Sequence, residues 1–121
     1  MRIFTLTAFQ KWAAKEGLTR AMLIAAVTEM ERGLIDAELG GFVCKKRIAL
    51  PGRGKSAGAR TLIAFKSEDR AIFMYGFTKN QQANIRENEL KALKLLAKEL
   101  MSYDNDALSK AISAAALKEV I

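Results

Sequence analysis

The first third of the chain passes from an extended pattern of hydrophobic residues to two helical ones. Arg2 to Thr7 is rich in β-branched and aromatic residues, which predicts a strand. Ala8 to Glu16 has its apolar positions at helical spacing and is followed by Gly17, so we predict a short helix that ends there. A second helix is predicted from an N-cap at Thr19. Its expected apolar face consists of Leu23, Val27, Met30 and Leu34, with Ile24 beside it. We expect the two helices to form a hairpin that packs on a sheet.

Three strands are predicted in the middle of the chain, from Phe42 to Ala49, from Arg60 to Lys66 and from Arg70 to Phe77. Leu50 to Ala59 holds the only proline and three glycines, so we expect a loop there. Ser67-Glu68-Asp69 is a tight polar turn, which makes the second and third strands an antiparallel hairpin.

Period-2 alternation assigns the side chains of the first of these strands to two faces. Lys45 and Arg47 lie on one face, and Cys44 and Lys46 lie on the other. We expect Cys44 to be buried on the inner face and chemically inert. Gly76, near the end of the third strand, predicts a bulge or the close approach of another segment.

The last third is predominantly helical. Ala83 to Met101 carries leucines at helical spacing and predicts the longest helix, and Asp104 or Asn105 caps a last short helix. The tail from Ser113 carries no clear pattern. The predicted order is β-α-α-β-β-β-α, so the expected fold class is α+β. We expect a small antiparallel sheet with two N-terminal helices packed on it and a long C-terminal helix, the helices being gathered on one side.

Composition narrows the class of protein. The chain has 121 residues, of which half are hydrophobic and 27% are charged, so it is long enough for one modest core. We therefore expect a single domain over residues 1–121. Its tail, from about residue 104, is expected to form a separate short helix. There is no apolar run of membrane-spanning length, and no charged start followed by an apolar core and a small-residue cleavage site, so we expect neither a membrane span nor a leader. The single cysteine fits a reducing cytoplasm, which is the expected location. The absence of histidine excludes Ser-His-Asp catalysis and most transition-metal sites, so we expect neither a metal nor another cofactor.

The excess positive charge is confined to residues 42–66. This segment holds seven basic residues and no acidic one, whereas the remaining residues carry 13 of each sign, so the whole formal net charge of +7 lies here. Its basic residues are Lys45, Lys46, Arg47, Arg53, Lys55, Arg60 and Lys66. Such a concentration of charge indicates a polyanionic partner.

The loop partly matches two phosphate-binding motifs, but it lacks a feature that each of them requires. Gly54-Lys55-Ser56 resembles the end of a P-loop, but Ala49 stands where the first glycine is needed and a strand follows instead of a helix. The GxGxxA spacing from Gly52 fails as a dinucleotide fingerprint for the same structural reason. We interpret the glycines as allowing a cationic loop, from which Arg53 and Lys55 project, to approach a phosphate backbone closely.

Lys45, Arg47 and Arg60 form the central candidate site. If their strands pair, the three cations lie within about one or two strand spacings of each other. The alternative is a solvated sheet edge whose lysines prevent aggregation, which we disfavour because no acidic residue in the segment neutralises the cluster. Lys79 and Asn80 either add a cation and an amide at the same end of the sheet or serve as a polar entry to the long helix, with Asn80 or Asn84 as a cap. No pair of carboxylates is spaced convincingly for glycosidase-like or metal-assisted chemistry.

Several motifs together resemble the RelE superfamily of bacterial toxins. They are a K-x-R strand, a G-x-GK-x-x-G-x-R loop and a Y-G-x-x-KN turn, in KKRIALPGRGKSAGARTLIAF and IFMYGFTKNQQANI, followed by a leucine-rich helix. These motifs and the upstream EMERGLIDAELGG are similar to the HigB-like branch, and the resemblance covers about Phe9 to Met101. It implies a RelE-like fold, a ribosome-dependent mRNA endonuclease, and neutralisation by a helix-turn-helix antitoxin encoded beside it.

The resemblance also assigns roles to single residues. Lys45 and Arg47 match the two basic positions of the catalytic strand. Arg60 matches the arginine that steadies the scissile phosphate, and Lys79 matches the late basic position near the end of the sheet. From their charge and position, and not from the resemblance, we assign to RNA or ribosome binding the residues Lys46, Arg53, Lys55, Lys66 and Asn80.

The chain departs from some relatives at one position. Those relatives carry a tyrosine shortly after the last basic residue, where this chain has Ile85 or neighbouring amides. Tyr75 lies before the turn and is not an evident replacement. A stacking or proton-transfer role therefore has no assigned residue.

The resulting hypothesis is metal-independent cleavage of translated mRNA by attack of a ribose 2′-hydroxyl on the adjacent phosphate. Lysine acts as general base or lowers the pKa of the hydroxyl, and the arginines stabilise the transition state. The leading alternative is a basic RNA- or ribosome-binding module without chemistry. A third is a DNA autorepressor component, but no helix carries clustered Arg and Asn for a major groove, so contact with DNA is expected only through the antitoxin.

Overall fold

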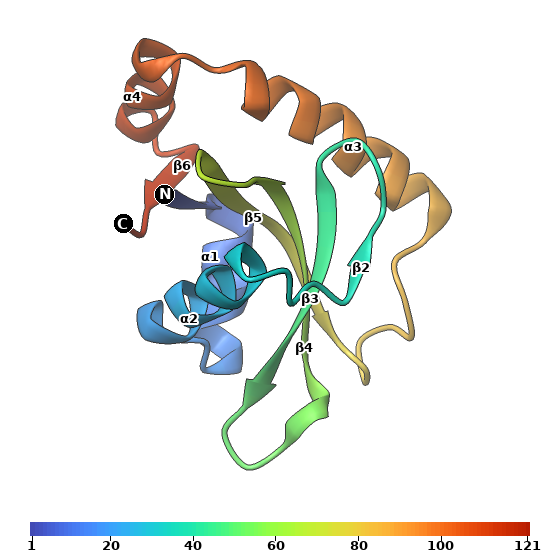
Figure 1. The fold of residues 1–121 in the computed structure, drawn as a ribbon. Helices are drawn as coiled ribbons and strands as arrows, with labels where there is room; N and C mark the ends of the chain where they lie inside the picture. The colour runs from blue at the N-terminus through green and yellow to red at the C-terminus, as the bar shows by residue number, and fades with distance from the viewer.

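A six-stranded sheet runs through the centre of the molecule, with four helices packed against it (Figure 1). The computed structural model describes residues 1–121, except for the side chains of residues 54–56. In chain order the elements are β1 (Arg2–Leu6), α1 (Thr7–Glu16), α2 (Arg20–Glu31), β2 (Ala37–Glu38), β3 (Val43–Leu50), β4 (Gly54–Lys66), β5 (Arg70–Thr78), α3 (Glu87–Ser102), α4 (Asn105–Ser113) and β6 (Leu117–Glu119). The strand order is β2-β3-β4-β5-β1-β6. β1 runs parallel to β5 and the other neighbouring pairs are antiparallel, which confirms the α+β class. None of the described helices has both the length and the apolar character that crossing a membrane requires.

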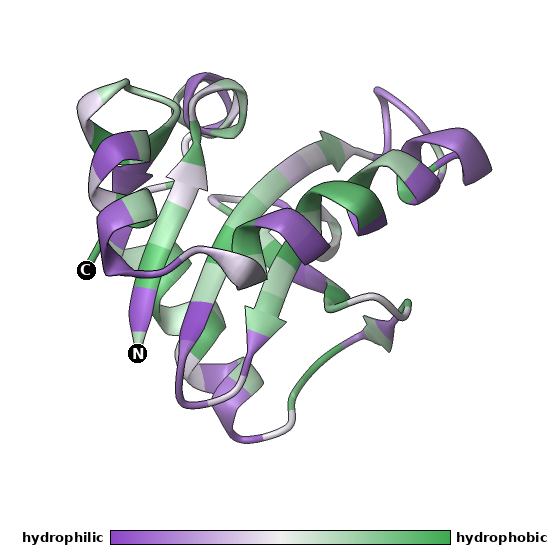
Figure 2. Cartoon of the chain, turned by 90° about the horizontal axis from the view of Figure 1, so that it is seen from above, coloured by the Kyte–Doolittle hydropathy of each residue, from purple (hydrophilic) through white to green (hydrophobic). Residues whose placement is uncertain are grey.

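The helices cover both faces of the sheet. α1 and α2 pack on one face, where Phe9 and Phe73 are fully buried. α3 and α4 pack on the other, over a core that includes Leu62 and Leu100. Figure 2 shows the central strands largely in hydrophobic colours, as expected for a sheet covered on both sides. The expectation that the helices gather on one side is therefore wrong, because side chains alternate across the strands and give the sheet two apolar faces that both need cover.

The two N-terminal helices follow the predicted local signals. α1 ends at Gly17, whose φ of 81° is the left-handed conformation that glycine adopts readily. α2 is capped by Thr19, whose hydroxyl accepts a hydrogen bond from the backbone N–H of Met22 at 3.2 Å. α2 ends at Glu31, however, and Leu34 lies beyond it with 56% of its surface exposed. Leu34 is therefore not part of the apolar face of this helix.

The C-terminal region contains both predicted helices and one strand that was not predicted. α3 begins at Glu87 and not at the predicted Ala83. At its start the carboxylate of Glu89 accepts a hydrogen bond of 2.9 Å from the backbone N–H of Arg86. α4 is capped by Asp104, which was one of the two residues predicted for this role. The tail then forms β6, which pairs with β1 at the edge of the sheet. This segment is extended because it pairs with β1, at the other end of the chain. The hydrophobic pattern of the tail alone therefore did not predict the strand.

The hairpin between β3 and β4 is longer than predicted. β3 continues to Leu50 and β4 begins at Gly54, and these two residues are paired across the hairpin. The turn is therefore confined to residues 51–53, and the expected loop from Leu50 to Ala59 is mostly strand. Once β3 and β4 are in register, the ladder between them continues through the glycines, which the local composition does not reveal.

Gly76 combines both features that the sequence predicted. Leu62 of β4 pairs with Tyr75, but the next residue of β4 pairs with Phe73, so β5 accommodates one additional residue, Met74. The indole ring of Trp12 lies against Gly76 so closely that a Cβ atom there would overlap the ring. The strand is thus bulged, and α1 approaches its backbone directly.

Candidate nucleic-acid interface

β3 and β4 bring three predicted site residues onto one face of the sheet. In the antiparallel register Arg47 lies opposite Arg60, and Lys45 lies opposite Leu62. Lys45 and Arg47 are therefore about 7 Å apart along β3, and Arg60 is one strand spacing, about 5 Å, from Arg47, counted between Cα atoms. Leu62 belongs to the core beneath α3, so the cations lie on the side of the sheet that α3 covers further along. The predicted proximity of these residues is confirmed, and we call them the cationic face.

The arrangement of the cationic face is not explained by stability or by protection of an edge. Like charges placed directly opposite each other destabilise an antiparallel pair, yet Arg47 and Arg60 occupy such positions. Arg60 lies on the interior strand β4, and Lys45 is covered by β2, so edge protection does not account for these two cations, whereas β2 does not reach as far as Arg47. Arg60 is only 9% exposed, whereas Lys45 is half-buried and Arg47 is exposed. Among the described residues, no ion pair joins a carboxylate to Lys45 or Arg47.

The opposite face of β3 is closed. Lys46 is 4% exposed, and its Nζ atom lies 2.7 Å from Glu29 Oε1 and donates to the carbonyl oxygen of Leu34 at 2.8 Å. Lys46 thus anchors β3 to α2 and to the segment after it, which corrects the expectation that it belongs to an RNA-binding surface. Cys44 is buried on the same face, and burial together with the nearby Glu38 carboxylate raises the pKa of its thiol to about 11. Its expected inner position is confirmed.

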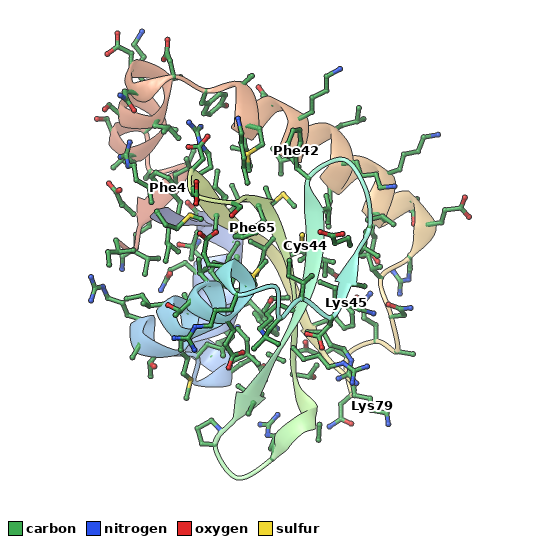
Figure 3. All side chains as sticks on the ribbon, viewed as in Figure 1. Phe4, Phe42, Cys44, Lys45, Phe65 and Lys79 are labelled. Carbon is green, nitrogen blue, oxygen red and sulfur yellow. The ribbon has the colours of Figure 1, made fainter. Side chains whose placement is uncertain are left out.

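A second group of predicted residues meets where β5 ends. Arg53, Lys79 and Asn80 line a hollow of about 210 Å³ together with Ala57 and Thr78. Figure 3 shows Lys79 on the same side of the sheet as Lys45, beyond the end of the strand. The N-cap of α3 is Arg86, so Asn80 does not cap that helix. The structure therefore gathers a cation and an amide after β5 beside the turn of the β3–β4 hairpin.

Two further predicted cations stand apart from this geometry. Lys66 lies at the other end of β4, six residues or roughly 20 Å from Arg60 along the strand. Its Nζ atom is 3.8 Å from a carboxylate oxygen of Asp69, and its side chain is largely exposed. The structure thus does not bring Lys66 to the cationic face. The side chain of Lys55 falls outside the described residues.

Tyr75 lies on the cationic side although sequence reasoning did not select it. It is paired with Leu62, which is paired with Lys45, so the three residues form one row across β3, β4 and β5. The single O–H of the phenol is shared between two acceptors, Gln82 Oε1 at 2.8 Å and Glu89 Oε2 at 3.1 Å. The bulge at Met74 shifts the alternation of β5 and sets which face Tyr75 presents. The only signal in the sequence was Gly76, which indicated a bulge but not its consequence.

Burial and hydrogen bonds move the pKa values of Tyr75 and Glu89 further from neutral pH. Burial, and after it the hydrogen bond to Glu89, raises the pKa of Tyr75. The backbone N–H of Arg86, followed by the amide of Gln82, lowers the pKa of Glu89. At neutral pH the phenol is therefore protonated and the carboxylate is ionised, so the tyrosine ring is held by its hydroxyl end.

Acidic groups near the cationic face are engaged elsewhere. The carboxylate of Asp36 accepts the backbone N–H of Arg47 at 2.6 Å, and Glu89 binds Tyr75 and the start of α3. Among the described side chains, no three cysteine, aspartate or glutamate residues are grouped in a way that could hold a metal ion. These two carboxylates therefore bind the backbone and the phenol.

Comparison with known proteins identifies the family. The family model described as the RelE toxin of the RelE/RelB toxin–antitoxin system matches residues 1–120. No curated protein is similar enough to match the chain. Since the matched span covers the sheet and all four helices, the chain belongs to the RelE toxin family and is the toxin of a toxin–antitoxin pair.

Proposed function

We propose that this toxin is a ribosome-dependent endoribonuclease of the HigB-like branch that cleaves translated mRNA and so inhibits translation in the cytoplasm. The observation that carries the proposal is the cross-strand pair of Arg47 and Arg60, with Lys45 on the same face, in a chain of this family. The K-x-R strand, the G-x-GK-x-x-G-x-R loop and the Y-G-x-x-KN turn support the branch. The proposed partner is a helix-turn-helix antitoxin. The toxin contacts DNA only through this antitoxin.

The chemistry follows from the side chains present. A ribose 2′-hydroxyl loses its proton to the amine of Lys45 and attacks the adjacent phosphorus. The bond from phosphorus to the 5′ oxygen of the next nucleotide then breaks, and that oxygen takes up a proton from water, while Lys45 returns its proton to the solvent. The products are a 2′,3′-cyclic phosphate and a 5′-hydroxyl end. Arg60 and Arg47 stabilise the charge of the transition state, and burial of Arg60 strengthens this effect because the local dielectric is low.

The hollow at the end of β5 extends the binding surface. Arg53, Lys79 and Asn80 offer two cations and an amide to the RNA backbone beyond the scissile phosphate. Lys79 also keeps the catalytic role that its motif position implies, and Lys55 in the same hairpin is assigned to backbone binding. The ribosome supplies positioning of the mRNA, a source of much of an enzyme's rate, so weak cleavage of free RNA is expected.

The test compares mRNA cleavage by four proteins during translation. They are the wild type, Lys45→Ala, Arg60→Ala and, as a control that removes one exposed charge from the outside of α3, Lys98→Ala. We expect Arg60→Ala to lower the cleavage rate by about 100-fold or more, as for loss of one transition-state donor, and Lys98→Ala to cleave normally. The fragments should end in a 2′,3′-cyclic phosphate or a 3′-phosphate.

Two outcomes would change the assignment. Undiminished cleavage by Arg60→Ala removes the proposed phosphate clamp. Binding to RNA or ribosomes without any cleavage by the wild type supports instead a non-catalytic basic module. A helix-turn-helix protein encoded beside the toxin gene, and inhibition of cleavage by that protein, supports the proposed antitoxin.

A further inference from the structure

The short segment before β2 contacts three consecutive residues of β3. The carbonyl oxygen of Leu34 accepts a hydrogen bond of 2.8 Å from the Nζ atom of Lys46. The backbone N–H of Asp36 donates to the carbonyl oxygen of Lys45 at 3.0 Å. The Oδ2 atom of Asp36 accepts a hydrogen bond of 2.6 Å from the backbone N–H of Arg47. Asp36 therefore binds the backbone of both cations that β3 contributes to the cationic face, and the function described so far gives it no role.

The backbone hydrogen bonds of β3 alternate between its two neighbouring strands. In an antiparallel sheet the N–H and C=O groups of one residue point to one neighbour, and those of the next residue point to the other. Because the C=O of Lys45 and the N–H of Arg47 both bond to Asp36, these two residues point toward the β2 side. Arg47 and Arg60 thus face each other across β3 and β4 without backbone hydrogen bonds between them.

The pair of Arg47 and Arg60 therefore needs support from outside β4. Their charges repel each other, and a pair of this kind brings its side chains closer together than a hydrogen-bonded pair does. The pairing of β2 with β3 covers Cys44 and Lys45 but does not extend to Arg47. The carboxylate of Asp36 takes the place of the strand at this point, through a hydrogen bond that its charge strengthens.

We propose that Asp36 is a positioning residue, which holds Arg47 opposite Arg60 so that both guanidinium groups bind one phosphate. The inference rests on the proposed function, because the phosphate is that of the RNA. Asp36 acts through the backbone N–H of Arg47 and not on the RNA itself. Among the described residues, no ion pair joins a carboxylate to the guanidinium group of Arg47, so this arrangement orients the residue without neutralising it.

A second exposed carboxylate provides a matched control. Glu31, at the end of α2, accepts the backbone N–H of Glu68 at 3.2 Å, in the turn between β4 and β5. This bond is of the same chemical kind as that of Asp36, but it lies beyond Lys66, at the end of β4 away from the cationic face. Removing the Glu31 carboxylate therefore costs an exposed charge and one backbone hydrogen bond without affecting Arg47.

The first experiment measures how firmly Arg47 is held, without any RNA. Amide hydrogen exchange is compared in the wild type, Asp36→Ala, Asp36→Asn and Glu31→Ala. We expect the amide of Arg47 to exchange about tenfold faster in Asp36→Ala, because its hydrogen-bond acceptor is lost. Asp36→Asn should restore part of the protection, since its side-chain oxygen still accepts a hydrogen bond, and Glu31→Ala should leave Arg47 unchanged. Equal exchange of this amide in Asp36→Ala and the wild type would overturn the proposal.

The second experiment is a double-mutant cycle between Asp36→Ala and Arg47→Ala. Two quantities are measured: mRNA cleavage during translation, and the affinity for oligothymidylate at low ionic strength, which lacks the 2′-hydroxyl and is not cleaved. We expect Asp36→Ala alone to lower the cleavage rate about tenfold and the affinity about threefold. In the Arg47→Ala background the same substitution should cause no further loss, because the residue through which Asp36 acts is gone. Losses that simply add would show a role in general stability and overturn the proposal.

The outcomes distinguish this inference from the proposed function. A wild type that never cleaves mRNA, with a non-additive cycle for oligothymidylate affinity, rejects the nuclease and supports the role of Asp36. Normal cleavage by Asp36→Ala, with the Arg47 amide protected as in the wild type, rejects that role and leaves the nuclease intact. Far-ultraviolet circular dichroism and melting temperatures that match between Asp36→Ala and Glu31→Ala exclude a folding defect as the cause of any difference between them.

Discussion

Lys45 and Lys46 are neighbours on β3, and the structure treats their charges in opposite ways. Lys46 faces α2, where a carboxylate of Glu29 and the carbonyl oxygen of Leu34 bind its ammonium group and solvent is excluded. Lys45 faces the other way, beside Arg47 and opposite β4, and has no ion pair among the described residues. The difference teaches that excess charge in a segment does not by itself mark a binding residue. A cation that burial would penalise is paired within the fold, and a cation that remains on an open face is available to a partner.

The largest effect on folding is expected at the closed face. Glu29→Ala leaves the buried ammonium group of Lys46 without its carboxylate, so we expect the free energy of unfolding to fall by about 3 kcal/mol. The estimate is at the low end for a broken buried pair because the carbonyl oxygen of Leu34 remains. Denaturant unfolding followed by circular dichroism measures the change. Lys45→Ala, on the open face, should stay within about 0.5 kcal/mol of the wild type.

A double variant sharpens this prediction. Glu29→Ala combined with Lys46→Met removes both charges and retains an apolar side chain at position 46, so part of the lost stability should return. If Glu29→Ala and Lys45→Ala instead destabilise the protein equally, the contrast between the two faces is wrong.

A smaller effect is expected where α1 meets the bulge of β5. Gly76→Ala places a methyl group where the indole ring of Trp12 lies, so the helix or the ring must move. We expect a loss of about 2 kcal/mol, in the range for overpacking. Thermal unfolding measures it, and replacing Trp12 by the smaller phenylalanine in the same protein should restore part of the loss. An unchanged melting temperature for Gly76→Ala would show that α1 is not held against the strand as described.

The smallest effect is expected for a cation that is both exposed and paired. The bidentate bond from Arg2 holds the pKa of the Glu119 carboxyl below its usual value of 4.5. Because the pKa is lowered in the folded state, the stabilisation is present above about pH 4.5 and is lost as the pH falls through the folded value. Both side chains are about one-third exposed, so the contribution should be less than about 1 kcal/mol. Urea unfolding at about pH 6 and about pH 3 should therefore show a slightly smaller acid loss for Glu119→Gln than for the wild type.

Elements that depend on near neighbours were predicted well. Gly17 ends α1, Thr19 caps α2 and Asp104 caps α4, as expected from local hydrogen-bonding chemistry. The alternation of β3 also placed Lys45 and Lys46 on opposite faces correctly. The errors lie where pairing between distant segments overrides local composition. The glycine-rich part of the hairpin became strand, and the tail became β6 because β1 was available to pair with it.

The candidate site shows the same division. The basic residues of β3 and Arg60 could be chosen from the sequence because charge and period are local properties. Tyr75 could not, since the face it presents depends on a bulge whose position is set by the register between β4 and β5.

The sequence by itself determined the class of the protein, one end of three of its helices and the location of its excess charge, because these follow from composition and from spacing along the chain. The tertiary structure decided which cations are buried and paired, that Tyr75 shares the face of Lys45, and which residues face each other across the strands. The physical reason is that register and burial are properties of segments far apart in the sequence, and their free energies appear only when those segments are packed together.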